Sequence, residues 1–354
     1  MAAGGAGVTT HGFLLGKFMP VHAGHLFLID VARHHVARLT VLLCSHDAEP
    51  IDGKLRAEWM RRCLPGDVRL IHMHRDIPQE PGDHPDFWAI WRAAIREHHP
   101  EPIDTVFGSE PYVMRLAETL GASPFPVDIP RATVPVSAHA IRANPAAHWA
   151  HVPGPVRPHF QRRVCLMGPE STGKSTLAAT LAADLGGPHI PEHGRDYDAT
   201  FRQGAAWSAA DFTELARRHA ALAAAIAERA GPVVIEDTDL LQTMVWAKHL
   251  LGHVPDALAA RLDTFCPADL YLLLSPDVPW HDDGTRYFGA EAARRRFHDD
   301  CEALLAQVGA KVRHITGSDW NVRAETARLS LLGQSTPGGT GGWPPVPSRA
   351  TRPA

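Results

Sequence analysis

One segment constrains this chain more than any other: residues 168–175, which read GPESTGKS. They fit the pattern GxxxxGK[ST], follow the apolar run Arg163–Met167 and precede a helix-like run, TLAATLAADL. In that setting the backbone N–H groups of the loop wrap a β-phosphate, Lys174 reaches the β- and γ-phosphates and Ser175 places an oxygen on Mg²⁺. We therefore predict an ATP-binding loop, formed by Gly168, Glu170, Ser171, Thr172, Gly173, Lys174, Ser175 and Thr176.

Three further segments of this half carry side chains suited to phosphoryl transfer. In VVIEDTD, carboxylates at the tip of a second strand hold Mg²⁺ or accept a hydroxyl proton. We expect Asp237 to take the metal or base role and Asp239 to be the best candidate for a helix N-cap. In WHDDGTR, Arg286 is a candidate lid residue over the γ-phosphate, and a plain surface loop is the alternative. EHGRDY offers an acid, an arginine and an aromatic ring that can grip a riboside, and an ion-paired turn is the alternative.

A second phosphate-binding motif lies near the N-terminus, GKFMPVHAGH at residues 16–25. His22 and His25 are three residues apart at the start of a helix-like run, so both face one point. The free N–H groups of a helix start favour a phosphate there, and Lys17 adds a positive charge. This cradle suits nucleotidyl transfer, which requires positioning and electrostatic stabilisation but no protein nucleophile. Ser137 and Arg142 of SAHAIR form a second phosphate-binding piece, with a capped surface helix as the alternative.

The order of the elements predicts two α/β domains. Short apolar runs alternate with helical patterns, which is typical of parallel sheets flanked by helices. We expect strands at Phe13–Leu15, Leu39–Cys44, Arg69–His74, Ile103–Phe107, Arg163–Met167, Val233–Ile235, Tyr271–Leu274 and Lys311–Ile315. The clearest helices are expected at Lys54–Leu64, Phe87–His98 and Ala210–Ala230. The predicted organisation is a Rossmann-like nucleotidyltransferase domain (10–150), a linker (151–162), a P-loop kinase domain (163–333) and a disordered Gly/Pro-rich tail (334–354).

Composition excludes several classes of protein. The net charge is −4, which provides no basic field for nucleic acid. The five cysteines are widely spaced without a CxxC pair, which argues against a disulfide framework or a zinc site. The N-terminus lacks a secretory pattern and no apolar run reaches the ~20 residues of a membrane helix. We expect a cytoplasmic protein that binds neither nucleic acid nor membrane.

Taken in order, these motifs resemble the NadR family of bifunctional nicotinamide-nucleotide adenylyltransferases and ribosylnicotinamide kinases. GKFMPVHAGH resembles the adenylyltransferase signature and SAHAIR the second nucleotide-binding motif, and GPESTGKST, EHGRDY, EDTD and WHDDGTR follow in the family's order. The resemblance covers about residues 12–332. Some members carry an N-terminal helix-turn-helix repressor. Here about eleven residues precede the first expected strand, so we expect no DNA-binding role.

The resemblance implies a salvage route that uses ATP and Mg²⁺: nicotinamide riboside is phosphorylated to the mononucleotide, which is then adenylylated to NAD. The ATP contacts of adenylyl transfer would be Gly16, Lys17, Phe18, His22, Gly24, His25, Ser137 and Arg142, with both histidines catalytic. In the kinase, Lys174, Asp237 and Arg286 would be catalytic, and Ser175 and Asp237 would hold the metal. Substrates would contact Trp88, Glu192, Arg195, Asp196, Tyr197 and Trp280.

Two other functions remain open, and the pattern is also compatible with a homo-oligomer. One is a fusion of pantetheine-phosphate adenylyltransferase with dephospho-CoA kinase, against which EHGRDY and WHDDGTR argue. The other is a sensor that binds NAD and ATP without turnover, against which the intact His22, His25, Lys174 and Ser175 argue.

Overall fold

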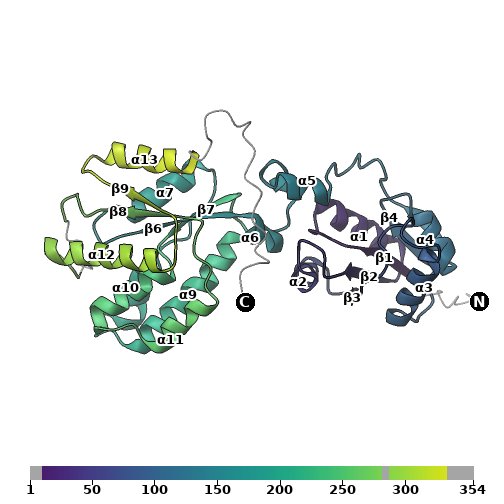
Figure 1. Cartoon of the computed structure of the whole chain (residues 1–354), viewed down its shortest axis with the longest axis horizontal. Helices are drawn as coiled ribbons and strands as arrows, with labels where there is room; N and C mark the ends of the chain where they lie inside the picture. The colour runs from purple at the N-terminus through teal and green to yellow at the C-terminus, as the bar shows by residue number, and fades with distance from the viewer. Residues whose placement is uncertain (1–9, 281–286, 333–354) are drawn as a thin grey trace, which may run out of the picture. The chain divides into compact units, whose positions relative to one another are not determined.

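Two parallel sheets form the frame of the molecule. The computed structural model describes residues 10–280 and 287–332, and the chain divides into two compact units between Val156 and Arg157. Each unit holds one parallel sheet flanked by helices (Figure 1). The predicted α/β fold class is therefore confirmed for both halves.

The first unit contains a five-stranded sheet in the order β3-β2-β1-β4-β5. Its strands are β1 (His11–Gly16), β2 (Arg38–Ser45), β3 (Val68–His74), β4 (Thr105–Gly108) and β5 (Ser123–Pro126). Its helices are α1 (Ala23–His35), α2 (Gly53–Cys63), α3 (Phe87–His98), α4 (Val113–Leu120) and α5 (Ala138–Ala143), followed by the 3₁₀ turns η1 (Ala146–His151) and η2 (Gly154–Val156). Strand β2 is buried at every position after Arg38, because a parallel sheet is covered on both faces.

The packing of this sheet sets the position of its ligand crevice. Phe13, Leu42 and Val106 of the strands pack in one cluster with Trp91 of α3 and Leu116 of α4. Strand β1 pairs with β2 on one side and β4 on the other, so the strand order reverses there. Ligands of parallel sheets bind beyond the carboxyl ends of the strands at such a point. The segments after β1 and β4 therefore lie where a nucleotide would bind.

The second unit contains a four-stranded sheet in the order β7-β6-β8-β9. Its strands are β6 (Arg162–Met167), β7 (Val233–Asp237), β8 (Leu270–Leu274) and β9 (Val312–Ile315). Its longer helices are α7 (Lys174–Asp184), α9 (Ala209–Ala227), α10 (Leu240–Leu251), α12 (Glu291–Gln307) and α13 (Trp320–Leu332). The short ones are α6 (Arg157–Phe160), α8 (Gly194–Tyr197), η3 (Asp198–Arg202), α11 (Asp256–Ala259) and η4 (Ala260–Asp263).

Two apolar layers sandwich this second sheet. Helices α7 and α13 cover one face, and α10 and α12 cover the other (Figure 1). The motif GPESTGKS connects β6 to α7, and β6 is flanked by β7 and β8. The loop therefore opens at the carboxyl edge of the sheet, next to the residues that follow β7.

Every strand expected from the sequence is present, and the three expected helices form as α2, α3 and α9. Strand β5 was missed, because its sequence, SPFP, carries two prolines, which a strand accepts at the edge of a sheet. The predicted linker, 151–162, contains the helical turns η2 and α6. Arg286 and the predicted tail, 334–354, lie outside the described residues. None of the described helices combines the length and the apolar composition needed to cross a bilayer.

Candidate active sites

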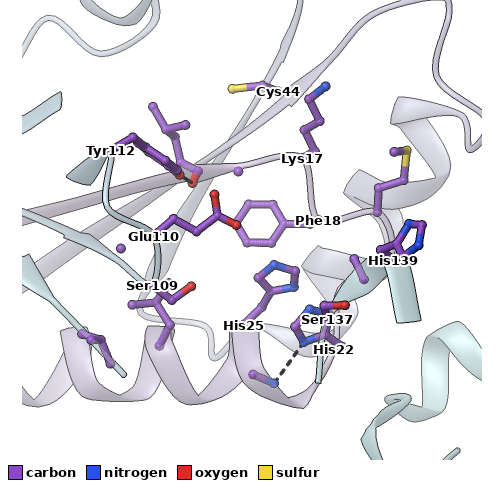
Figure 2. A pocket seen from close by; sticks show the side chains of 18 of the residues that line it. Lys17, Phe18, His22, His25, Cys44, Ser109, Glu110, Tyr112, Ser137 and His139 are labelled. Atoms are coloured by element: carbon purple, nitrogen blue, oxygen red, sulfur yellow. Dashed lines mark hydrogen bonds between the residues drawn. The ribbon is translucent and has the colours of Figure 1, made fainter. Parts of the chain in front are cut away.

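The histidine motif of the first unit forms a stacked imidazole pair. His22 is the N-cap of α1, and its Nδ1 accepts a hydrogen bond from the backbone N–H of Gly24 at 3.1 Å. The ring of His22 stacks on that of His25 with centroids 3.8 Å apart, and the ring edge of Phe18 meets His25 at 4.9 Å. Figure 2 shows these three side chains together on one side of the pocket, near Ser137. Because Nδ1 of His22 is an acceptor, the proton of the neutral ring lies on Nε2.

Burial keeps both imidazoles neutral. It lowers the pKa of His22 to about 4, with smaller contributions from the positive charges of Arg131 and His151. Burial also holds the pKa of His25 well below its usual value, and His22 and Arg131 lower it further. Neutral rings donate hydrogen bonds without repelling a nearby lysine or arginine. The pair therefore offers two N–H donors to an anion at neutral pH.

These histidines open into a cavity of about 650 Å³. Every first-unit residue that the sequence selected lines it: Gly16, Lys17, Phe18, His22, Gly24, His25, Trp88, Ser137 and Arg142. Further residues line the cavity without belonging to either motif, among them Ser109, Glu110 and Tyr112 after β4, and Arg131. Figure 2 places Ser109, Glu110 and Tyr112 across the pocket from the histidines. Arg131 lies in an aperiodic segment, so no spacing in the sequence could have selected it.

Two cations of the cavity are held by specific partners. Ser137 caps α5, since its Oγ accepts from the N–H of Ala140 at 3.1 Å, and Arg142 of the same helix donates to the carbonyl oxygen of Met19. SAHAIR thus packs against the histidine motif. Lys17 lies 3.3 Å from the buried carboxylate of Glu49.

The loop after β6 needs glycine at both ends. Gly168 has φ +138°, and a Cβ on it would lie 2.5 Å from the carbonyl oxygen of Leu274. Gly173 has φ +82°. Lys174 is buried, and its Nζ donates to the carbonyl oxygen of Pro169 at 3.0 Å, which folds the side chain back over the loop. Beyond it, Ser175 is exposed at the start of α7.

The three carboxylates after β7 have different partners. Glu236 pairs with Arg163 and lies 3.6 Å from the Nε2 of His219. Arg163, together with His219, outweighs the effect of burial, so that the pKa of Glu236 is lowered. Asp239 caps α10, as predicted, by accepting from Leu241 N–H at 2.9 Å. Asp237 is 1% exposed and its Oδ1 has no hydrogen-bond partner in the described part of the chain. Asp237 is therefore the carboxylate that has an oxygen left for a ligand.

Beside the loop lies a second cavity, of about 340 Å³. Of the residues that the sequence selected, Glu170, Lys174, Glu192 and Arg195 line it. Burial raises the pKa of Glu192, against the opposing effect of the Lys174 ammonium. Two cationic and two acidic side chains selected from the sequence thus line one cavity.

Asp237 and Ser175 do not line this cavity, and neither do three of the second-unit residues predicted to contact the substrate. Asp196 is exposed. Tyr197 is packed in an apolar cluster with Phe212, and its hydroxyl donates to Asp211 at 3.0 Å, so it supports the wall from behind. The ring of Trp280 lies against Gly289.

The aromatic side of the cavity consists of residues that no sequence motif marks. Trp207, Trp246 and Tyr287 line it together with Asp198. The Trp207 Nε1 donates to the Tyr287 hydroxyl at 3.0 Å, and that hydroxyl donates to Asp198 at 2.8 Å. Trp207 lies in the loop before α9 and Trp246 lies in α10, and neither has a motif around it, so only the fold brings them to the site.

Glu170 connects the phosphate-binding loop to this aromatic side. Its carboxylate accepts from the backbone N–H groups of Tyr287, at 3.1 Å, and Phe288, at 2.5 Å. The loop and one wall of the cavity are therefore joined by a single side chain.

The comparisons agree with this division into two sites. Residues 13–144 match a cytidylyltransferase-like family model and residues 163–323 match an AAA domain model. The trifunctional NAD biosynthesis/regulator protein NadR of Salmonella typhimurium is 28% identical over 333 residues, which cover 88% of this chain and 80% of that protein. The protein of the same name from Escherichia coli K12 is 28% identical over 335 residues, 89% of this chain and 80% of that protein.

The chain is thus similar to NadR proteins along most of its length. Two solved NadR structures share its fold. One, in complex with NR, matches with a TM-score of 0.71 at 22% identity. The matched region covers 93% of this chain and 97% of the chain in that structure. The other, in complex with NAD and AMP-PNP, matches with a TM-score of 0.70 at 22% identity. The matched region covers 95% of this chain and 99% of the chain in that structure.

Proposed function

We propose that this chain makes NAD in two ATP-dependent steps, first phosphorylating nicotinamide riboside and then adenylylating the resulting mononucleotide. The observation that carries the proposal is that each unit contains a cavity lined by residues of its own phosphate-binding motif: Lys17, His22 and His25 in the first unit, and Glu170 and Lys174 in the second. The similarity to NAD biosynthesis proteins along most of the chain supports the choice of substrates.

In the kinase unit, the 5′-hydroxyl of the riboside attacks the γ-phosphorus of ATP. A bond forms from the 5′-oxygen to phosphorus, the bond from phosphorus to the β,γ-bridging oxygen breaks, and ADP leaves. Lys174 moves from the Pro169 carbonyl to the phosphates and stabilises their charge. Glu192, in the cavity wall, accepts the hydroxyl proton, for which its raised pKa suits it. The aromatic side of the cavity, with Trp207 and Tyr287, receives the nicotinamide ring.

The residues of the kinase unit fit Mg²⁺ that arrives with ATP. No three His, Cys, Asp or Glu side chains of the described ranges gather closely enough to hold a metal ion by themselves. Asp237 has a buried oxygen without a partner, and Ser175 has an exposed hydroxyl at the loop. One carboxylate, one hydroxyl and the phosphates are the ligand set that Mg²⁺ takes in nucleotide sites. When bound, the ion neutralises charge on the phosphates.

In the first unit, a phosphate oxygen of the mononucleotide attacks the α-phosphorus of ATP and pyrophosphate leaves. No proton is transferred. The two neutral imidazoles donate hydrogen bonds to the reacting phosphates, and Lys17 and Arg142, which line the same cavity, add positive charge. Trp88 of α3 lines the same cavity and is the proposed contact of the nicotinamide ring.

Incubation of the protein with nicotinamide riboside, ATP and Mg²⁺, followed by chromatography, tests this function. We expect the mononucleotide to accumulate first and NAD to follow, with ADP and pyrophosphate as co-products. Phosphorylation of dephospho-CoA in place of the riboside would refute the proposed substrate. Binding of NAD and ATP without any turnover would refute the proposal that the chain is an enzyme.

A further inference from the structure

Trp320 is an exposed aromatic residue beside the phosphate-binding loop of the kinase unit. It is the first residue of α13, and 54% of its surface is exposed, more than for any other Phe, Tyr or Trp in the described ranges. Tryptophan side chains are on average highly buried because of their large apolar surface. An indole left open at this place therefore has a free face that a flat ligand could cover.

The indole is fixed against the loop. A Cβ on Gly173 would lie 2.4 Å from Cζ3 of Trp320, so the ring sits directly on that glycine. The buried guanidinium of Arg323 lies 5.7 Å from the ring centroid. The same guanidinium donates to the carbonyl oxygens of Thr172 and Ser275, both at 3.2 Å. These contacts fix the indole ring and the start of α13 against the phosphate-binding loop.

The acceptor cavity and this indole lie on opposite sides of the loop. The sheet order is β7-β6-β8-β9, and the loop follows β6. The cavity uses Thr238 and Gln242, which follow β7, together with residues of α9. Trp320 follows β9, at the other edge of the sheet. Phosphoryl transfer requires the γ-phosphate to face the acceptor, so the base, at the far end of the nucleotide, leaves the loop toward the β9 side.

We infer that Trp320 is the platform on which the base of the phosphate donor stacks in the kinase unit. The ligand class is a nucleoside triphosphate whose base covers the free face of the indole. Stacking uses the π-face that every base has, so the platform strengthens binding of ATP and of other purine nucleotides alike. The inference rests on the proposed kinase function for the identity of the reaction, but the stacking itself is measurable by binding alone.

The kinetic test compares Trp320→Ala and Trp320→Phe with the unchanged protein. Loss of one stacked base weakens binding by about 10-fold. We expect Trp320→Ala to raise the KM for ATP in riboside phosphorylation by about this factor while kcat changes little. Trp320→Phe keeps an aromatic face and should recover most of the loss. The KM for ATP in adenylyl transfer, measured on the same samples, should not change and also reports that the protein is folded.

The binding test separates the contribution of the base to binding from that of the phosphates. Calorimetry measures the affinity for Mg²⁺–ADP and for inorganic tripolyphosphate, which carries phosphates without a base. Binding that remains in Lys174→Ala is subtracted as binding elsewhere on the chain. Trp320→Ala should weaken ADP about 10-fold and leave tripolyphosphate unchanged. Leu329→Ala, which removes an equally exposed apolar residue of the same helix, is the matched control and should change neither.

The outcomes are distinct. If Trp320→Ala leaves the affinity for ADP unchanged, the proposal that Trp320 stacks on the base is overturned. This holds also if the variant alters only the self-association of the protein. Equal weakening of ADP and tripolyphosphate also overturns it, since the indole would then only support the loop. If the base-specific loss is found but the riboside is not phosphorylated, the platform stands and the proposed acceptor is wrong.

Discussion

At the scale of single residues, the two catalytic motifs use burial in opposite ways. In the first unit burial removes charge, since it keeps His22 and His25 neutral. In the second unit burial is offset by partners: Glu236 stays ionised next to Arg163, while Asp237 is left with an oxygen that has no partner in the described ranges. These contrasts give two predictions.

The first concerns acid stability. The pKa of His22 is about 4 in the folded protein and 6.5 in the reference state, so between these pH values the unfolded chain binds a proton that the folded chain refuses. Stability of the first unit should therefore be unaffected above pH 6.5 and fall as the pH drops toward 4, by ~3 kcal/mol from this group. His22→Asn keeps a side-chain acceptor for the helix cap and should reduce this loss, as measured by urea unfolding across that pH range. His34→Asn, at an exposed position of α1, is the control, and an equal pH dependence in all three proteins would contradict the assignment.

The second separates two neighbouring carboxylates. Asp237→Asn should lower kcat for riboside phosphorylation by about 10²–10³ with little change in thermal stability, because Oδ1 of Asp237 makes no hydrogen bond in the described part of the chain. Glu236→Gln breaks a buried ion pair with Arg163 and should cost about 3 kcal/mol of stability instead. A reversed pattern, with Asp237→Asn unfolding the protein and Glu236→Gln inactivating it, would contradict these roles.

At the scale of elements, the strand–loop–helix of the kinase unit depends on a backbone shape. Gly168→Ala would introduce a Cβ 2.5 Å from the Leu274 carbonyl oxygen at a φ of +138°. We expect this change to cost about 1–3 kcal/mol in unfolding experiments and to abolish riboside phosphorylation. Gly186→Ala, also at positive φ but with no atom within 4 Å of the added Cβ, is the control for backbone strain alone. Equal effects of the two changes on phosphorylation would contradict the requirement for close approach.

Elements also show how far the sequence alone could lead. Local patterns sufficed where the signal was local: the strands that precede GKFMPVHAGH and GPESTGKS, and the capping role of Asp239. They failed for β5, whose prolines are tolerated only because it lies at an edge, and for Arg131 and Trp207, which reach their cavities through packing. They also placed Tyr197 in the riboside pocket, whereas its hydroxyl is bound to Asp211 behind the wall.

At the scale of the whole molecule, two cavities in two units imply two separable activities. Lys174→Ala should abolish riboside phosphorylation and leave adenylylation of supplied mononucleotide intact, since that lysine lines only the second cavity. His25→Ala should do the reverse, lowering NAD formation by about 10²–10³. An equal mixture of the two variants should restore NAD formation from riboside, because the mononucleotide can diffuse between molecules. Loss of both activities in either folded variant would contradict the two-site arrangement.

The carboxylate of Glu170 has a consequence for how the kinase unit binds its two substrates. It belongs to the loop that receives the donor, yet it holds the backbone of Tyr287, which forms part of the acceptor pocket. A shift of the loop around ATP is therefore passed on to the riboside side, and the free-energy coupling is the same in both directions. Donor and acceptor are expected to influence each other's affinity, a cooperativity that Glu170→Gln should weaken.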